Sequence, residues 1–586
     1  PLPTVEASCR RFLEGCAPLR SDDQLAETEA AVVAFQAPDG PAHALQAELE
    51  RFDATPGVHS WLDRFWPTRY LGRRDRIALN ANFFFLFNDA PGLGQVERAA
   101  GLIAGSVAYK LRLDREEVPP ALLRGRPMSM VQQRFLFSTT RIPGERQDGV
   151  RAPYGDEWPG PSPFRHIVVF HRGHMMRMNV IGPDGRPYAL DDLAAGLRAV
   201  MAATDQPAAP GTSAGSLTTK ARAEWAASRA RLAALSPANR EALDTIETAL
   251  FCVCLEDLAP SGTREACDHL LHGDSRNRWF DKAVSLVVFA DGRAGINDEH
   301  CGLDGTTVVG FVDSLLTASP EEHAAAAGAV AQGAPPIAPV TFVLDDEARA
   351  DVEAAAAAFA DYAAASATST LAFDGFGSER VKALRISPDG FAQMAFQLAH
   401  NRSKGFLGAT YESISTRQYE HGRTEAMRVV TPEALAFVEA MDDPGAEPAK
   451  RAELFRAAAA KHVARAKECQ QGDAPEQHLW ELLMIQQRAG AELGVTDAPA
   501  LYSSPGWQVM RDDYLSTSAV PSVNVQYFGF GSTSPTCIGV AYSLLPRGLN
   551  VYLCTPKAVA AEMHRFGDEV VRAFTELEAL AAAEPA

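Results

Sequence analysis

The sequence predicts an α/β protein, because runs typical of strands alternate with helical segments in both halves of the chain. Its 586 residues are 46% hydrophobic and 22% charged, which is enough for several domains with packed cores. The formal net charge is −19, and no basic block is present. Nucleic acids and anionic membranes bind clustered lysines and arginines, so we expect neither as a partner. Since no long apolar stretch occurs, no membrane span is predicted.

The cysteines indicate the compartment. There are nine of them, scattered along the chain without a Cys-x-x-Cys pair, which is typical of reduced thiols. The opening residues also lack the basic region and apolar core of a secretory signal. We therefore expect a cytoplasmic protein.

The first half of the chain alternates helices and strands. Ser21 and Gln24 predict a capping box at the start of a helix. Further predicted elements are an apolar run at 83–87, a helix at 95–113, a strand pair at 165–181, helices at 221–258, and two strands at 284–297 joined by an Asp291-Gly292 turn. The loop-like stretch 324–340 ends in a predicted domain boundary.

The second half opens with an alanine-rich helix at 346–366 and contains the clearest helix signal of the chain. Ser387 is the expected N-cap of a helix over 388–404, Pro388 its first residue, and Gly405 lies beyond its end. Three strand-like runs follow near 523–530, 537–545 and 549–554, and a long helix closes the chain.

A histidine follows the second strand of the 284–297 pair, in the segment NDEHCGLDG. His300 at a strand-to-loop turn is a candidate general base, since a neutral imidazole takes a proton from a hydroxyl near neutral pH. Asp304 and Gly305 are expected to shape the turn. This pattern alone is only moderately specific. The alternative is therefore a buried histidine whose one role is to bond to a backbone carbonyl.

Two polar segments are candidate binding regions. The small hydroxyls of LSTSAVP, residues 515–521, are able to donate to an oxyanion, although a solvated Ser/Thr turn is the simpler interpretation. Residues 411–425 either line a polar pocket or form a solvated helix surface. No metal site is predicted at His166, His171 and His174, because the last two lie three apart on a strand, on opposite faces, and no carboxylate completes the set.

Taken together, these segments resemble the carnitine/choline O-acyltransferase family. The matching pieces follow the family's order along nearly the whole chain: PLPTVEASCRRFL, SMVQQRFLFSTTRIPG, RHIVVFHRGH, HLLHGDSRNRWFDK, GINDEHCGLDGTT, ISPDGFAQMAFQLAH, ATYESISTRQYEHGRTEAMR and YLSTSAVPS. The resemblance implies a two-domain α/β monomer, whose halves are each similar to a chloramphenicol acetyltransferase subunit, with a tunnel at their interface. It assigns residues 1–80 with 345–586 to the oxyanion and acceptor domain, and residues 81–344 to the domain of the catalytic histidine.

The resemblance also implies the reaction and its residues. An acyl group moves reversibly between a thioester and an alcohol, with coenzyme A or phosphopantetheine thioester as co-substrate and no permanently bound cofactor. His300 matches the catalytic base and Ser518 the hydroxyl that stabilises the oxyanion. Supporting residues are Ser516, Glu299 and Asp304; acceptor-binding positions are Tyr411, Thr424, Gln477, Phe530 and Thr533; coenzyme A positions are Lys382 and Asp389.

Departures from the family concern acceptor and donor. Gln477 stands where carnitine-specific members carry an arginine, and a neutral amide gives up the bidentate charged pair with a carboxylate. Ser532-Thr533-Ser534 replaces an apolar Pro-Val-Val, and hydroxyls suit a polyol. Ser378 replaces one of two lysines of the coenzyme A 3′-phosphate site, a contact that a carrier-bound phosphopantetheine does not need.

We therefore expect an O-acyltransferase that acts on a polyol or another non-carnitine alcohol. An acyl carrier protein is a candidate partner, and release of a polyketide product is a candidate role. Two alternatives stay open: a true carnitine or choline O-acyltransferase, and a non-catalytic binding protein that kept the fold. A condensation-type acyltransferase is disfavoured, because Glu299 stands where such enzymes carry a second histidine.

Overall fold

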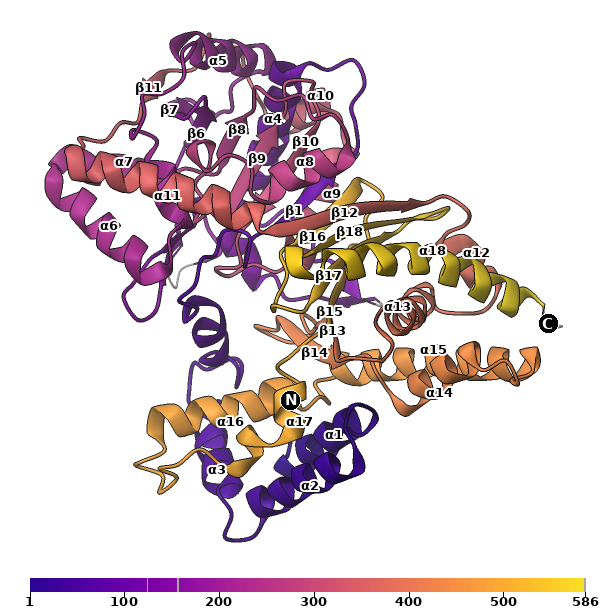
Figure 1. Cartoon of the computed structure of the whole chain (residues 1–586). Helices are drawn as coiled ribbons and strands as arrows, with labels where there is room; N and C mark the ends of the chain where they lie inside the picture. The colour runs from indigo at the N-terminus through magenta and orange to yellow at the C-terminus, as the bar shows by residue number, and fades with distance from the viewer. Residues whose placement is uncertain (124, 155–157, 584–586) are drawn as a thin grey trace. The chain divides into compact units, whose positions relative to one another are not determined.

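The structure is a computed structural model that describes residues 1–123, 125–154 and 158–583 (Figure 1). The chain forms two compact units. Unit 1 comprises Pro1–Trp66, Ala367–Ala519 and Ser532–Ala586, and unit 2 comprises Pro67–Ser366 and Val520–Gly531. These units divide near residues 66 and 366, whereas the sequence predicts divisions near 80 and 345. Residues 520–531 belong to unit 2 because strand β16 (Val525–Phe530) pairs with β1 (Phe83–Phe87) of its sheet.

Unit 2 is built on a mixed sheet with the strand order β11-β7-β6-β8-β9-β10-β1-β16. Its other strands are β6 (His166–His171), β7 (His174–Asn179), β8 (Cys252–Leu255), β9 (Val284–Val288), β10 (Ala294–Asp298) and β11 (Ile337–Pro339). The central strands are apolar and buried on both faces, and β6, β8 and β9 run parallel, as expected where helices cover both sides of a sheet. Two short hairpins lie outside this sheet: β2 (Leu122–Leu123) with β3 (Arg126–Pro127), and β4 (Thr140–Ile142) with β5 (Gly149–Arg151).

The helices of unit 2 pack around this sheet. They are α4 (Gln95–Asp114), α5 (Leu190–Ala203), α6 (Arg222–Leu235), α7 (Pro237–Thr248), α8 (Thr263–Leu271), α9 (Gly305–Thr317), α10 (Pro320–Ala326) and α11 (Asp346–Ala364). Helix α8 is tied to the sheet by Asn297, whose amide donates to the Leu270 carbonyl at 2.9 Å. Helix α9 begins directly after the turn that carries His300.

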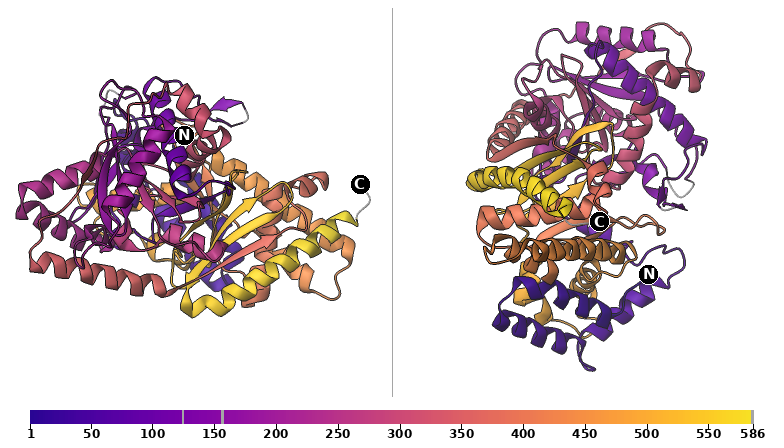
Figure 2. Two further views of the ribbon diagram at one scale, coloured as in Figure 1. Left: turned by 90° about the horizontal axis from the view of Figure 1, so that it is seen from above. Right: turned by 90° about the vertical axis from the view of Figure 1, so that its right-hand side faces the viewer.

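Unit 1 contains a second mixed sheet with the order β12-β18-β17-β15-β13-β14. These strands are β12 (Ser366–Phe373), β13 (Thr410–Ser415), β14 (Thr424–Arg428), β15 (Leu515–Ala519), β17 (Ile538–Leu544) and β18 (Leu549–Pro556). Helices α13 (Pro388–Lys404), α14 (Pro432–Asp442), α15 (Pro448–Gln470) and α18 (Ala560–Ala582) share one apolar core with one face of this sheet. The left view of Figure 2 shows α18 lying along the strands of this sheet.

A second apolar cluster of unit 1 joins the start of the chain to a late segment. It is formed by α1 (Val5–Cys16), α2 (Asp22–Gln36), α3 (Ala42–Asp53), α16 (Glu476–Ala489) and α17 (Pro505–Val509). The short α12 (Ser378–Ala383) lies beside α13. None of the helices in the described part of the chain is long and apolar enough to cross a membrane.

Predictions that rest on local capping and turn chemistry are confirmed. Ser21 and Gln24 form the capping box of α2. Helix α13 begins after Ser387 and ends at Gly405, whose φ of 89° is left-handed, as a terminal glycine allows. The Asp291-Gly292 turn joins β9 to β10, and the 165–181 segment forms the hairpin of β6 and β7. The α/β class is also confirmed.

Three predictions of local structure are wrong. The helical prediction over 221–258 fails at Cys252–Leu255, a short buried strand, because a fully buried strand lacks the alternating pattern that would reveal it. Residues 411–425 form the hairpin of β13 and β14 rather than a helix surface. Residues 515–521 contain strand β15 rather than a solvated turn, since neighbouring strands on both sides bury Leu515 and Thr517.

Candidate active site

His300 occupies the turn between β10 and α9, and a hydrogen bond holds one of its two ring nitrogens. Nδ1 lies 2.8 Å from the Leu303 carbonyl oxygen, which can only accept, so Nδ1 carries the proton. The ring stacks on Tyr70 at 5.1 Å between centroids and also contacts Phe83. This tautomer leaves Nε2 as the basic nitrogen, and the side chain is 24% exposed, so a substrate can reach it.

Asp304 supports the turn from its far end, as expected. Its carboxylate lies 3.6 Å from His300 Nδ1 and accepts a 2.6 Å bond from the Gln132 side-chain amide. The carbonyl oxygen of the same Gln132 side chain accepts from the Asp304 backbone N–H and from the Thr307 hydroxyl. Gln132 therefore fixes the first turn of α9. It also positions the Asp304 carboxylate that faces Nδ1 of His300.

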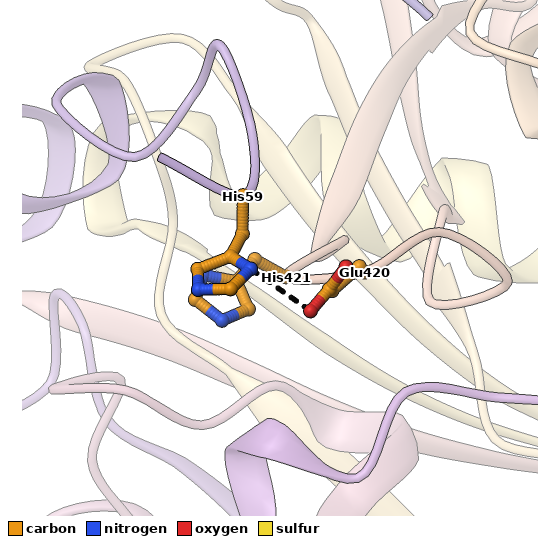
Figure 3. Close-up of side chains that lie close together, drawn as sticks. All are labelled: His59, Glu420 and His421. Carbon is orange, nitrogen blue, oxygen red and sulfur yellow. Dashed lines mark ion pairs between the residues drawn. The ribbon is translucent and has the colours of Figure 1, made fainter. Parts of the chain in front are cut away.

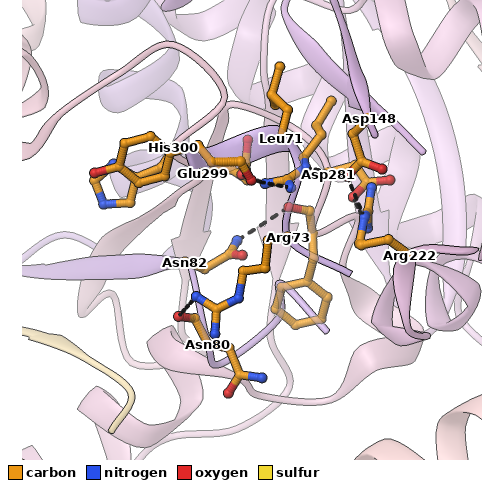
Figure 4. A network of polar contacts seen from close by, with 12 residues as sticks. Leu71, Arg73, Asn80, Asn82, Asp148, Arg222, Asp281, Glu299 and His300 are labelled. Atoms are coloured by element: carbon orange, nitrogen blue, oxygen red, sulfur yellow. Dashed lines mark hydrogen bonds and ion pairs between the residues drawn. The ribbon is translucent and has the colours of Figure 1, made fainter. Parts of the chain in front are cut away.

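Glu299 belongs to a buried ionic network beneath the histidine (Figure 4). Its carboxylate accepts from Arg141, and the Arg141 guanidinium also donates to Asp148 at 2.6 Å. Arg222 continues the network by bonding to Asp148 and to Asp281. Because these groups are almost completely buried, their charges compensate one another and hold the backbone on either side of His300 in one geometry.

Asp298, the residue before Glu299, is also buried, and neither of its carboxyl oxygens has a hydrogen-bond partner among the described residues. Burial raises its pKa well above the ordinary value of 3.8, so the folded protein keeps this carboxyl protonated as the pH rises. In the unfolded chain the same carboxyl loses its proton near its ordinary pKa. The contribution of Asp298 to stability is therefore best in acid and falls as the pH rises above that value.

We predict that Asp298→Asn stabilises the protein relative to wild type, and more so at about pH 7 than at about pH 5, by up to about 1.4 kcal/mol per pH unit. The amide has the same shape and does not titrate. Urea unfolding at the two pH values measures the difference, with the exposed Asp39→Asn as control. An equal effect at both pH values would mean that the Asp298 carboxyl titrates normally.

Ser518 lies on strand β15 of unit 1, and register places three other predicted residues on the same face of the sheet. On β15, Ser516 and Ser518 lie on one face and Thr517 lies on the other. Tyr411 of β13 pairs with Ser516. Thr424 of β14 pairs with Ser415, which is on the same face of β13 as Ser413 and Tyr411. Side chains of one strand alternate between faces, so Tyr411, Thr424, Ser516 and Ser518 point the same way, opposite to the apolar core. The hydroxyl groups of these four side chains therefore lie on one face of the sheet.

The opposite face carries a buried polar cluster directly behind Ser518. Gln393 of α13 donates to the Thr517 hydroxyl and to the Tyr542 hydroxyl, both at 2.9 Å. Tyr542 in turn donates to Asp389 at 2.7 Å. His462 lies 3.3 Å from Asp389 and 3.2 Å from Glu412. The cluster thus links charged groups of α13, α15 and β13 to Thr517, the residue between Ser516 and Ser518.

The charges of this cluster follow from burial and pairing. Burial lowers the pKa of His462, but its bonds to Asp389 and Glu412 outweigh that effect and raise the pKa to about 10, so the ring is a cation at neutral pH. Burial and the nearby Asp389 raise the pKa of Glu412 to about 7. One cation is thus shared between two carboxyl groups, and Asp389 is committed to this cluster.

Tyr542→Phe tests whether the cluster is a structural element. We predict a loss of about 1–3 kcal/mol of stability, because Asp389 loses a donor and Gln393 loses an acceptor inside the protein. Urea unfolding of the variant and of Tyr362→Phe, which removes one exposed hydrogen bond to Asn80, provides the comparison. A loss no larger than that of the exposed control would show that water satisfies the cluster.

The remaining predicted residues lie on several elements. Gln477 is in the first turn of α16 and is 7% exposed. Phe530 ends β16 in unit 2, where it pairs with Phe83. Thr533 directs its hydroxyl to the Cys537 sulfur at 3.3 Å. Lys382 is on the exposed side of α12.

The three histidines of the β6–β7 hairpin have separate partners. His171 and His174 pair directly across the hairpin, so the prediction that they lie on opposite faces of one strand is wrong. His171 Nδ1 bonds to the Thr204 hydroxyl, whereas His174 donates to the Gln206 carbonyl oxygen. His166 donates to the Thr245 carbonyl oxygen, and burial lowers its pKa to about 4.

Several residues that shape the site were missed by sequence reasoning. Gln132 and Arg141 both lie in the segment SMVQQRFLFSTTRIPG, which indicated the family but gave no role for either side chain. His462 and Tyr542 lie far along the chain from Asp389, and only the packing of α15 and β17 against α13 brings them together. For Arg141 and His462, the signal that the sequence offered was a charged or titratable residue within a largely apolar segment.

Comparison with known proteins gives the family. The family model described as choline/carnitine O-acyltransferase matches residues 1–572. Carnitine O-acetyltransferase of Rattus norvegicus is 30% identical over 564 residues, 94% of this chain and 88% of that protein. The mitochondrial carnitine O-palmitoyltransferase 2 of the same species is 30% identical over 583 residues, covering 93% and 86%. Its peroxisomal carnitine O-octanoyltransferase is 31% identical over 541 residues, covering 90% and 86%.

These matches, with the fold, define a two-domain α/β acyltransferase. The chain belongs to the choline/carnitine O-acyltransferase family. It is therefore an enzyme that transfers an acyl group between a coenzyme A thioester and a small alcohol.

Proposed function

We propose that His300 is the general base of this transfer and that Ser518 stabilises the oxyanion. Nε2 takes the proton of the alcohol while the alcohol oxygen attacks the thioester carbonyl carbon. The carbonyl oxygen becomes an oxyanion, to which the Ser518 hydroxyl donates. When the carbon–sulfur bond breaks, the leaving thiolate takes the proton from Nε2, and the imidazole returns to its starting state.

The observation that carries this proposal is the bond from His300 Nδ1 to the Leu303 carbonyl oxygen. It fixes the tautomer in which Nε2 accepts a proton, before any substrate arrives. Because a thioester is already activated, the reaction needs one proton acceptor and one oxyanion donor, without a covalent enzyme intermediate.

For the acceptor, we propose a polyol or another alcohol that lacks a carboxylate. The Gln477 side chain is neutral, and the Arg428 guanidinium, which bonds to the neighbouring residue Glu476, is already neutralised. Arg428 donates to both Glu476 carboxylate oxygens and to Asp513. Arg511 also donates to Glu476, so two cations meet two anions. A further carboxylate placed against this group would therefore meet no net positive charge.

A second candidate acceptor is carnitine itself. It is favoured by the names of the relatives, which are carnitine acyltransferases for acetyl, palmitoyl and octanoyl groups. Tyr411 and Thr424, at positions that match carnitine-carboxylate contacts, also share a sheet face with Ser518. Both hydroxyls serve a polyol equally well, so they do not decide between the two.

For the donor, we propose that a phosphopantetheine thioester on an acyl carrier protein is used as well as coenzyme A. The support is Ser378, which begins α12 and offers no positive charge to a 3′-phosphate. Lys382, four residues further on, still offers one positive charge. Release of a polyketide onto the acceptor alcohol would follow from such a donor.

The test is a matrix of substrates followed by thiol release. Acetyl-, octanoyl- and palmitoyl-coenzyme A, and their 3′-dephospho forms, are each offered with carnitine, choline, glycerol and a sugar alcohol. We expect the highest kcat/KM with a polyol, and little loss on removal of the 3′-phosphate. Carnitine as the best acceptor would overturn the acceptor proposal and leave the family assignment intact.

We predict that Gln477→Arg lowers the KM for carnitine by about 10–100-fold, the value of one charge-assisted hydrogen bond in a desolvated site. Gln477→Lys, which supplies a charge without the planar fork, should give a smaller gain. Steady-state kinetics with acetyl-coenzyme A and both variants measures the difference. An unchanged KM in both variants would mean that position 477 does not face the acceptor.

A further inference from the structure

A group of two imidazoles and one carboxylate lies in unit 1 outside the residues used above. It consists of His59, from the segment after α3, with Glu420 and His421, from the loop between β13 and β14 (Figure 3). His59 Nδ1 lies 2.9 Å from Glu420 Oε1, and the two imidazole rings are 4.5 Å apart between centroids. One potential ligand atom of each residue falls within 4.8 Å of the others.

Asp63 organises this group from behind. Its Oδ2 accepts the backbone N–H groups of His59 and Ser60 at 3.1 and 3.2 Å. Its Oδ1 accepts from His421 Nδ1 at 3.2 Å. One carboxylate thus fixes the backbone of the first histidine and the ring of the second. A carboxylate on Nδ1 is the usual support of a histidine that binds a metal through Nε2, because it sets the tautomer and increases the basicity of the ring.

The loop that carries Glu420 and His421 is held in an unfavourable conformation. His421 has a φ of 55°, in the left-handed region that non-glycine residues seldom adopt. A side chain at Gly422 would meet the Thr416 carbonyl oxygen, so glycine is required there. Tyr419 anchors the loop by donating to the Gln471 carbonyl oxygen. These contacts therefore fix the position of the His421 ring in the loop.

We propose that His59, Glu420 and His421 bind a Zn²⁺ ion, with water completing a tetrahedron. Two imidazole nitrogens and one carboxylate oxygen form a known zinc ligand set, whereas Mg²⁺ and Ca²⁺ prefer oxygen alone. The ion replaces the direct contact between His59 Nδ1 and Glu420 Oε1. It joins the segment at 57–66 to the β13–β14 loop and so restrains the hairpin that carries Thr424.

The alternative is an ordinary exposed ion pair between His59 and Glu420. An ion pair needs neither His421 nor Asp63, and it requires the imidazole to be protonated. The two interpretations therefore differ in which substitutions matter and in whether a divalent ion changes the protein.

The experiment is a titration of the metal-free, full-length chain with Zn²⁺ against a chromogenic chelator, with Co²⁺ as a spectroscopic substitute. We expect one ion per chain, Co²⁺ absorption of tetrahedral type, and a higher thermal unfolding midpoint with zinc. His59→Gln and His421→Asn should lose the ion, and asparagine tolerates the left-handed backbone. Asp63→Asn should weaken binding by about 10–100-fold.

His564→Gln is the matched control, because His564 is an exposed histidine of unit 1 outside the cluster. Stoichiometric binding that persists in both His59→Gln and His421→Asn would overturn the proposal, as would an absence of saturable binding to the wild-type chain. Since no substrate is present in the titration, its outcome is independent of the proposed acyl transfer.

Discussion

Replacing His300 with asparagine should lower kcat/KM for acyl transfer by about 10²–10⁴-fold, the usual contribution of a general base. The asparagine amide can still donate to the Leu303 carbonyl oxygen, which in the wild type accepts from Nδ1. It lacks a second nitrogen, so it cannot take the proton of the alcohol. The variant therefore separates the structural bond of this ring from its chemistry. Thiol release with the best acceptor of the substrate matrix measures the loss.

Two controls make this result interpretable. His174→Asn changes a half-buried histidine of unit 2 that bonds to the Gln206 carbonyl, and it should keep full activity. Ser518→Ala removes the proposed oxyanion donor and should cost about 10²–10³-fold in kcat. A His300→Asn enzyme with near-normal activity, or one that fails to fold by circular dichroism, would not support His300 as the base.

Local sequence signals were sufficient for the elements whose ends are set by neighbouring residues. Helix α13 illustrates this, because Ser387, Pro388 and Gly405 act within one turn of its ends. The same kind of reasoning failed for β8 and for the β13–β14 hairpin, where burial between other strands decides the conformation. Propensity and periodicity do not contain that long-range information.

The candidate site divides in the same way. His300 was found because its whole turn is local, from the end of β10 to the N-cap at Asp304. Tyr411 and Ser516 are about a hundred residues apart, and only the parallel register of β13 with β15 places them side by side. The resemblance to a family pointed to these residues as a set, but it could not supply the buried groups behind them.

Those buried groups fix the backbone behind each of the proposed catalytic side chains. Behind His300 lies the network of Glu299, Arg141 and Asp148, and behind Thr517 lies the cluster of Gln393 and Tyr542. In both places, charged or polar groups withdrawn from water are satisfied by one another and by nearby backbone groups. A reactive side chain on a strand end or turn thereby gains a fixed backbone, which precise placement of a base or an oxyanion donor requires.

Arg141→Met should destabilise unit 2 by about 3–5 kcal/mol, because it removes one partner of a buried ionic network and leaves the others uncompensated. In the wild type, Arg141 donates to Asp148, to Glu299 and to the Tyr70 carbonyl oxygen, at 2.6, 2.7 and 2.7 Å. Tyr70 stacks on His300, so activity should fall together with stability. Urea unfolding measures the first effect and thiol release the second.

The double variant Arg141→Met/Glu299→Gln decides whether uncompensated charge is the cause. If it is, neutralising Glu299 recovers part of the lost stability, since the amide no longer carries a buried negative charge. Arg186→Met, at an exposed arginine paired with Asp184, should change stability by no more than about 0.5 kcal/mol. Additive losses in the double variant would instead mean that Arg141 acts through packing alone. The charge network would then contribute specificity of geometry around His300 rather than stability, and the activity of the double variant would be the quantity that reports it.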